Sequence, residues 1–201
     1  PRLISIQLST LFSHLTSISK FVMSSPYLDL EGNPISEDRV IGCGSSALVL
    51  LQNHVAVKVP LRYIWSSELD VKRNIQSLHH EQEIYLRLQS PTIADERSRG
   101  IIRCLKASNS ATELTFMTNG DLRSYINRSN YINDSNLSRH TQLSWFLDLA
   151  RTLSFIHDQR ILVADIASRN FLLDTNLSIK FCDFSEASLL PLESDMSLVD
   201  D

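Results

Sequence analysis

Short runs of β-branched and apolar residues mark the first half of the chain. The runs at 40–49 and 55–59, separated by Gln52-Asn53, predict three short strands and a hairpin turn. Two more runs, at 101–105 and 113–117, predict two further strands. Together these segments predict a small, mostly antiparallel sheet.

A different pattern separates the two groups of strands. From Glu68 to Leu88 the apolar residues recur at helical spacing, which predicts one long helix. Glu81 falls on the apolar stripe of this helix, whereas Glu83 falls on the opposite side. We therefore expect Glu81 to face inward and Glu83 to face solvent.

The second half of the chain predicts helices joined by turns. Asn119-Gly120-Asp121 is a turn signal, and it leads into a short helix from Asp121 to about Ile126. A polar loop is expected over 127–136, and apolar residues at helical spacing predict a long helix from Leu143 to Ile156. Two short strands complete the pattern, at 161–163 and 179–182.

The turn at 119–121 divides the chain into a sheet-rich part and a helical part. We expect three segments: an extension over 1–37, a first lobe over 38–118 and a partial second lobe over 119–201. Residues 1–22 are rich in Ser, Thr, Leu and Ile and contain no acidic residue. This segment is predicted to be either a transit peptide or an extension ahead of Met23.

Charge and composition limit the classes of molecule that the chain is expected to bind. The formal charge is −4, and no Lys/Arg cluster is present, so nucleic acid and anionic membranes are not expected partners. No apolar run reaches the roughly 18 residues that a membrane-spanning helix needs. Cys43, Cys104 and Cys182 are scattered, which favours reduced thiols and a cytoplasmic or nuclear location.

A glycine-rich turn is expected between the first two strands, at Gly42-x-Gly44-x-x-Ala47. Without a Cβ, backbone amides can approach phosphate oxygens closely. The motif alone is weak evidence, because two glycines in a tight hairpin are more often just a turn.

Lys58 and Glu81 form a second candidate feature. Lys58 lies on a strand of otherwise apolar residues, where an unpaired ammonium is costly to bury. Glu81 has the same problem with the opposite sign. We therefore predict that the two side chains pair.

Three polar residues in the second half complete the candidate site. Asp165 and Asn170 are five residues apart, and Asp183 follows Asp165 by 18 residues, directly after a predicted strand. An aspartate can act as a general base, and carboxylate and amide oxygens suit magnesium.

The order and spacing of these motifs resemble the eukaryotic protein kinase catalytic domain over residues 38 to about 187. The resemblance implies an α+β, bilobal fold whose first lobe is an antiparallel sheet with one helix and whose second lobe is helical. It also implies ATP and Mg²⁺ as cofactors and transfer of the γ-phosphate to the hydroxyl of an unidentified protein substrate. The implied catalytic residues are Asp165, Lys58 and Glu81, the implied metal ligands are Asn170 and Asp183, and the implied nucleotide contacts are Gly42, Gly44, Val49, Ala56, Lys58, Thr115, Met117 and Asp121.

The chain also departs from the kinase pattern. Val163-Ala164 replaces the usual His-Arg, which predicts a kinase that is not switched by a phosphorylated activation loop. Ser185 replaces the glycine after Asp183-Phe184, and Ala167 with Arg169 leaves the choice between Ser/Thr and Tyr acceptors open. The chain ends 18 residues beyond Asp183, so we expect a truncated domain with an exposed apolar face on the helix at 143–156.

Three alternatives stay open. A nucleotide-binding pseudokinase is favoured by Ser185 and by Val163-Ala164, and a small-molecule phosphotransferase is disfavoured by the same segments. A metal site at His79-His80 is disfavoured because adjacent helical residues point apart. The sequence around Asp165 is most similar to divergent fungal kinase-like proteins.

Overall fold

The computed structural model describes residues 25–91, 95–132 and 137–196. The transit-peptide and extension interpretations of residues 1–22 therefore lie outside the described residues. So do residues 133–136 of the loop expected at 127–136.

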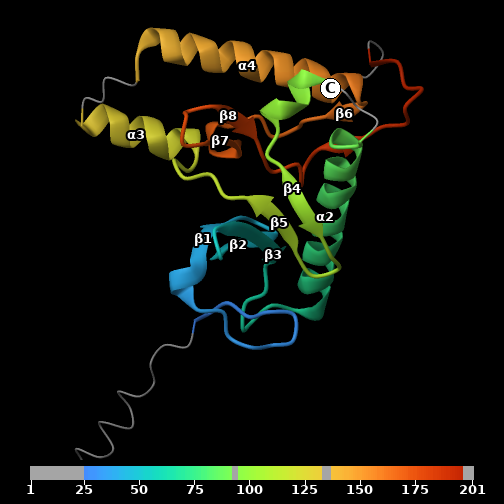
Figure 1. Cartoon of the computed structure of the whole chain (residues 1–201). Helices are drawn as coiled ribbons and strands as arrows, with labels where there is room; N and C mark the ends of the chain where they lie inside the picture. Colours follow the sequence, from blue (N-terminus) through green and yellow to red (C-terminus); the bar gives the residue numbers. More distant parts are fainter. Residues whose placement is uncertain (1–24, 92–94, 133–136, 197–201) are drawn as a thin grey trace, which may run out of the picture.

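A five-stranded antiparallel sheet forms the first part of the fold (Figure 1). Its order is β1-β2-β3-β5-β4, which confirms the predicted sheet. At the β2–β3 hairpin, Asn53 and His54 have φ values of 49° and 62°, the left-handed conformation that two-residue hairpin turns need. The strands are β1 (Val40–Cys43), β2 (Ala47–Gln52), β3 (Val55–Pro60), β4 (Cys104–Ala107) and β5 (Thr112–Thr115).

The helix α2 (Glu68–Leu88) runs beside this sheet and has the predicted bounds (Figure 1). Ser67 and Asp70 form a capping box that satisfies backbone N–H groups at its first turn. Glu81 is buried and Glu83 is exposed, as predicted. The helix therefore directs one carboxylate into the interior and one into solvent.

The second part contains two helices and short strand pairs (Figure 1). The helix α4 packs against β6, β8 and the 3-10 turn η2. The hairpin β7–β8 pairs Phe171 with Phe181, and β6 pairs with β9. The elements are η2 (Glu96–Gly100), α3 (Leu122–Ile132), α4 (Arg139–Asp158), β6 (Ile161–Leu162), η3 (Ser168–Asn170), β7 (Phe171–Leu173), β8 (Ile179–Phe181) and β9 (Ser188–Leu189).

Several predicted boundaries were wrong. The helix α4 begins at Arg139 and not at Leu143, and β5 ends at Thr115 and not at residue 117. The helix α3 continues to Ile132 instead of ending near Ile126, because Leu122, Tyr125 and Ser129 form a buried face that outweighs the low helix propensity of its Asn and Ser residues. The strand expected at 101–105 begins only at Cys104. Ile102 instead donates its backbone N–H to Phe181, which joins the two parts of the fold.

The predicted apolar face of α4 is exposed. Leu143, Phe146 and Leu147 keep 60%, 71% and 51% of their surface accessible. The opposite face of the helix, with Trp145 and Phe155, packs into the core. Within the described residues, α4 is therefore covered on one side only.

Candidate active site

Lys58 lies on β3, where alternate side chains face the interior. Ala56 and Pro60 share its face and are buried, and Lys58 itself is only 7% exposed. In the sheet register Lys58 lies opposite Val49 on β2 and Thr112 on β5. The strand therefore holds an ammonium group in an apolar setting, which requires anionic partners.

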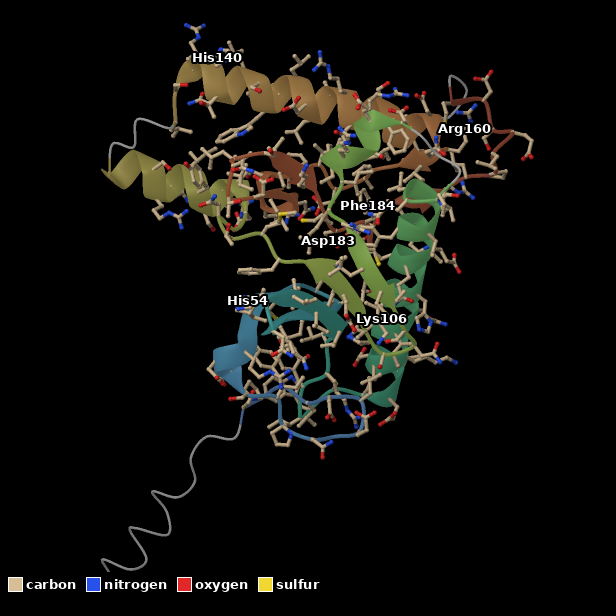
Figure 2. The ribbon with its side chains drawn as sticks, viewed as in Figure 1. His54, Lys106, His140, Arg160, Asp183 and Phe184 are labelled. Carbon is tan, nitrogen blue, oxygen red and sulfur yellow. The ribbon has the colours of Figure 1, made fainter. Side chains whose placement is uncertain are left out.

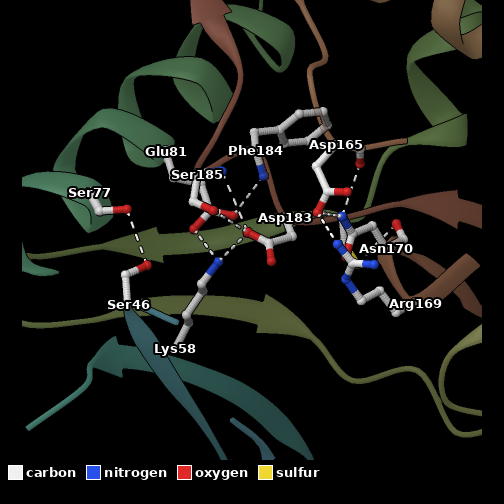
Figure 3. Close-up of polar contacts among 11 residues, drawn as sticks. Ser46, Lys58, Ser77, Glu81, Asp165, Arg169, Asn170, Asp183, Phe184 and Ser185 are labelled. Atoms are coloured by element: carbon white, nitrogen blue, oxygen red, sulfur yellow. Dashed lines mark hydrogen bonds and ion pairs between the residues drawn. The ribbon is translucent and has the colours of Figure 1, made fainter. Parts of the chain in front are cut away.

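Two carboxylates supply that charge (Figure 3). The Lys58 Nζ lies 2.7 Å from Oε2 of Glu81 and 2.9 Å from Oδ1 of Asp183. Glu81 comes from α2 and is completely buried, whereas the Asp183 side chain, from the segment after β8, is 40% exposed. The predicted Lys58–Glu81 pair is thus present, and Asp183 joins it.

Charge compensation keeps Lys58 and Asp183 ionised. Burial disfavours the ammonium, but Glu81 and Asp183 outweigh it, so the pKa of Lys58 lies above its ordinary value. Burial likewise opposes ionisation of Asp183, yet the Lys58 charge and hydrogen bonds from Lys58 and Ser185 hold the pKa of that carboxyl below its ordinary value. The site therefore presents a fixed cation beside an accessible anion at neutral pH.

Phe184 couples the end of this cluster to α2. Its backbone N–H donates to Oε1 of Glu81 at 3.1 Å, so both oxygens of that carboxylate contact the site. Its ring is buried and meets the Tyr85 ring edge-on, with centroids 5.4 Å apart. The helix therefore holds the segment after β8 by one polar and one aromatic contact. Figure 2 shows Asp183 and Phe184 between the sheet and the helical part.

The β7–β8 hairpin explains why distant residues meet. Because Phe171 pairs with Phe181, the residues before β7 and after β8 lie at the same end of the hairpin. The backbone N–H of Cys182 donates to the carbonyl of Asn170 at 2.9 Å. Asn170 and Asp183 are therefore brought to one place although 13 positions separate them.

Residues of the loop before β7 hold the side chain of Asp165 in place (Figure 3). The Asn170 Nδ2 donates to Oδ2 of Asp165 at 2.9 Å and to its backbone carbonyl at 3.0 Å. Arg169 Nη2 lies 2.6 Å from the same Oδ2. The Asp165 side chain keeps 34% of its surface accessible, so Oδ1 stays available to a proton donor from solution.

The donor atoms of the site match a hard cation. Nδ2 of Asn170 is used by Asp165, and within the described residues no hydrogen bond reaches its amide oxygen. All contacts to the Asp183 carboxylate from the described residues end on Oδ1, which leaves Oδ2. One carboxylate and one amide oxygen are too few to bind Mg²⁺ alone, but Mg²⁺ is commonly held by one or two carboxylates plus substrate phosphates.

Comparison with known families agrees with this geometry. The protein tyrosine and serine/threonine kinase family matches residues 42–197, which include every residue of this site. The chain belongs to this family. The α+β architecture with its five-stranded sheet is the predicted kinase fold.

Similar proteins include plant and animal kinases. The G-type lectin S-receptor-like serine/threonine-protein kinase LECRK3 of Oryza sativa subsp. indica is 26% identical, over 94% of this chain and 24% of its own length. Wall-associated receptor kinase 3 of Arabidopsis thaliana is 25% identical, over 81% of this chain and 21% of its own. Serine/threonine-protein kinase SIK1 of Mus musculus is 23% identical, over 73% of this chain and 18% of its own length. The chain thus spans about a quarter or less of these relatives. The fungal likeness stays a prediction.

The glycine-rich turn of this kinase domain connects β1 to β2. Gly44 donates its backbone N–H to Ala47 at 2.8 Å, which tightens the turn, and a Cβ on Gly42 would meet Val49 at 3.5 Å. The hydroxyls of Ser46 and Ser77 lie 3.2 Å apart, so the turn is tied to α2 one helical turn before Glu81. This contact was not predicted, because Ser46 occupies an unspecified position of the glycine-rich motif and Ser77 lies outside the motifs.

The predicted adenine contacts lie at the end of β5 and just after it. Thr115 ends this strand and donates its backbone N–H to Arg103 at 3.0 Å, and Met117 is buried and accepts from Gly120 at 3.2 Å. Asp121 accepts from the backbone N–H of Ser124 at 2.9 Å, so it caps the first turn of α3. The roles of these residues toward a nucleotide stay predictions.

Other features lie apart from the site. His79 and His80 bond to different carbonyls, those of Asn109 and Ala187, so they point apart as predicted. Among the described residues no cluster of His, Cys, Asp and Glu could hold a metal ion by itself. Val163 packs against the core, as predicted for an apolar substitute. No helix within 25–91, 95–132 or 137–196 is long and apolar enough to span a membrane.

Proposed function

We propose that this chain binds ATP with Mg²⁺ and transfers the γ-phosphoryl group to a protein hydroxyl. The observation that carries the proposal is the position of Lys58, whose ammonium contacts Glu81 and Asp183 together. A buried cation joined to a partly exposed carboxylate is the arrangement that a phosphate chain with its metal ion requires.

Each residue has a role in binding. Lys58 donates to the phosphate oxygens of the nucleotide, and Glu81 holds the ammonium in place from α2. Gly42 and Gly44 allow backbone amides to approach the phosphates, while Val49 and Ala56 line the apolar side. Thr115 and Met117 contact the base through backbone groups, and Asp121 contacts the ribose.

The metal site follows from the free oxygens. Asp183 Oδ2 and the Asn170 amide oxygen are the groups that would hold Mg²⁺. When bound, Mg²⁺ neutralises negative charge on the phosphates. Lys58 adds a second positive charge on the same side, so repulsion between the nucleotide and Asp183 is reduced.

Asp165 is the proposed general base. Its Oδ2 is held by Asn170 and Arg169, so Oδ1 is left to accept the proton of the acceptor hydroxyl. A positioned base of this kind contributes about 10²- to 10⁴-fold to a rate.

The acceptor is proposed to be serine or threonine. Two of the three relatives above, LECRK3 and SIK1, carry serine/threonine-protein kinase in their names, which favours this class. Arg169, which binds Asp165, stands where tyrosine kinases often carry arginine, so a tyrosine peptide belongs in the same assay. We also propose a reducing compartment, cytoplasmic or nuclear, because Cys43, Cys104 and Cys182 are all free thiols.

Direct ATP binding tests the proposal first. Calorimetry with ATP, with and without Mg²⁺, is followed by γ-phosphate transfer to serine, threonine and tyrosine peptides. The assay is made on this chain and on any longer natural form that contains it. We expect Mg²⁺-dependent binding and transfer that Asp165→Asn removes. Binding without transfer in every form contradicts the catalytic part, and absence of binding contradicts the whole.

A further inference from the structure

Ser185 makes an unusual set of contacts with Asp183 (Figure 3). Its hydroxyl donates to Oδ1 of Asp183 at 2.9 Å, and its backbone N–H reaches the same atom at 3.4 Å. Lys58 Nζ donates to that oxygen as well, at 2.9 Å. Three donors therefore hold one oxygen of the carboxylate, and the other oxygen is left for a ligand.

The backbone of Asp183 lies in the left-handed region. Its φ is +61°, a conformation that residues other than glycine rarely adopt. The neighbouring Cys182 and Phe184 fix the chain on both sides through backbone hydrogen bonds to Asn170 and Glu81. These bonds fix the main chain but leave the side-chain torsions of Asp183 to its own partners, Lys58 and Ser185.

The hydroxyl is the stronger of the two Ser185 contacts. An N–H···O separation of 3.4 Å lies beyond the usual 2.7–3.2 Å range, whereas 2.9 Å for the hydroxyl lies within the range for O–H···O bonds. A glycine at this position would keep only the long backbone contact. The kinase pattern has glycine here, so the short bond is a feature of this chain.

We propose that Ser185 is a positioning residue that orients Asp183 so that Oδ2 faces the Mg²⁺ of bound ATP. The proposal rests on the proposed function, since it concerns the same nucleotide site. The Ser185 hydroxyl acts through Asp183 and does not touch the metal. Partners of this kind commonly change metal affinity by about 10- to 100-fold when they are removed.

Titration of Mg²⁺ against ATP binding tests the proposal. Calorimetric ATP affinity is measured in a chelator and over a Mg²⁺ series for wild type, Ser185→Ala, Ser185→Thr and Ser185→Gly. Ser188→Ala, which removes an exposed hydroxyl on β9, is the matched control. We expect Ser185→Ala and Ser185→Gly to need about tenfold more Mg²⁺ for the same gain in affinity. Ser185→Thr and Ser188→Ala should match wild type, and binding in the chelator should be equal in all variants.

The outcomes separate the possible failures. If Ser185→Ala has the wild-type Mg²⁺ dependence, the positioning role is wrong. It is also wrong if Ser185→Gly matches wild type while Ser185→Ala does not, because both variants lack the hydroxyl and its loss would then not explain the effect. An equal loss with and without Mg²⁺, accompanied by a lower melting temperature, assigns Ser185 a structural role only. Wild type without Mg²⁺-dependent ATP binding contradicts the proposed function instead.

Discussion

Lys58 and Glu81 are joined by an ion pair of 2.7 Å that is almost fully buried. A buried pair contributes little by itself, but loss of one partner leaves an uncompensated charge. Asp183 also contacts Lys58, so the cation would retain one anion if Glu81 were neutralised. The pair therefore links the stability of the fold to the geometry of the proposed nucleotide site.

Replacement of Glu81 by glutamine tests that link. Removal of the only partner of a buried charge typically costs about 3–5 kcal/mol of unfolding free energy. We expect Glu81→Gln to cost less than this, because Asp183 remains as a partner of Lys58. Glu83→Gln is the matched control, since Glu83 is exposed on the same helix. Its effect should stay within about 0.5 kcal/mol. Urea denaturation measures both, and equal effects would contradict the assigned role of the pair.

Asp165→Asn should separate binding from chemistry. The substitution removes the free carboxylate oxygen that accepts a proton, so γ-phosphate transfer should fall about 10²- to 10⁴-fold. ATP affinity should stay at the wild-type value, because the contacts of Lys58 do not involve Asp165. Asp148→Asn, on the exposed surface of α4, is the control. A parallel loss of ATP affinity would place Asp165 in nucleotide binding instead.

Much of the first lobe could be predicted because its constraints are local. The helical spacing from Glu68 to Leu88 placed α2 and the inward side of Glu81 correctly. Two opposite charges at apolar positions predicted the Lys58–Glu81 pair, since neither can be buried alone. The parts that failed depend on distant packing. The extra length of α3 contains the buried Ser129, whose packing composition does not reveal.

The polar network around Asp183 could be predicted only in part. The position of Asp183 in the kinase pattern predicted a metal ligand. The spacing of the motifs did not predict its contact with Lys58. From the sequence, Ser185 was interpreted only as a replacement of the glycine in the kinase pattern. The hydrogen bond from Ser185 to Asp183 forms where Asp183 has a left-handed backbone, and a single sequence does not reveal that conformation.

Stability should depend on pH at both ends of the range. The pKa of Asp183 is lowered in the folded chain, so its contribution is present above its ordinary pKa near 3.8 and is lost as the pH falls through the folded value. The pKa of Lys58 is raised, so its contribution is present below its ordinary pKa near 10.5 and is lost as the pH rises through the folded value. Melting temperatures should therefore decline on both sides of a broad plateau. Asp183→Asn should flatten the acid decline, and an unchanged acid decline would contradict the assignment.

Gly100→Ala should destabilise the fold, whereas Gly44→Ala should leave the stability of the fold unchanged. A Cβ on Gly100, at the end of η2, would overlap Oγ1 of Thr152 on α4 and lie 2.8 Å from its Cβ. Because Thr152 is buried, the helix must shift, and Gly100→Ala should cost about 1–3 kcal/mol of unfolding free energy. The double variant with Thr152→Ala should recover part of this loss, since it removes the nearest atom.

Gly44→Ala is the matched substitution in the glycine-rich turn. Its Cβ would lie 3.6 Å from the nearest atom, the carbonyl oxygen of Ala47, which is an ordinary contact. The unfolding free energy should therefore stay within about 0.5 kcal/mol of wild type. ATP affinity should fall, because the added methyl group obstructs the approach of phosphate oxygens to the backbone amides. Unchanged ATP affinity in a stable Gly44→Ala variant would show that the phosphates do not lie against this turn.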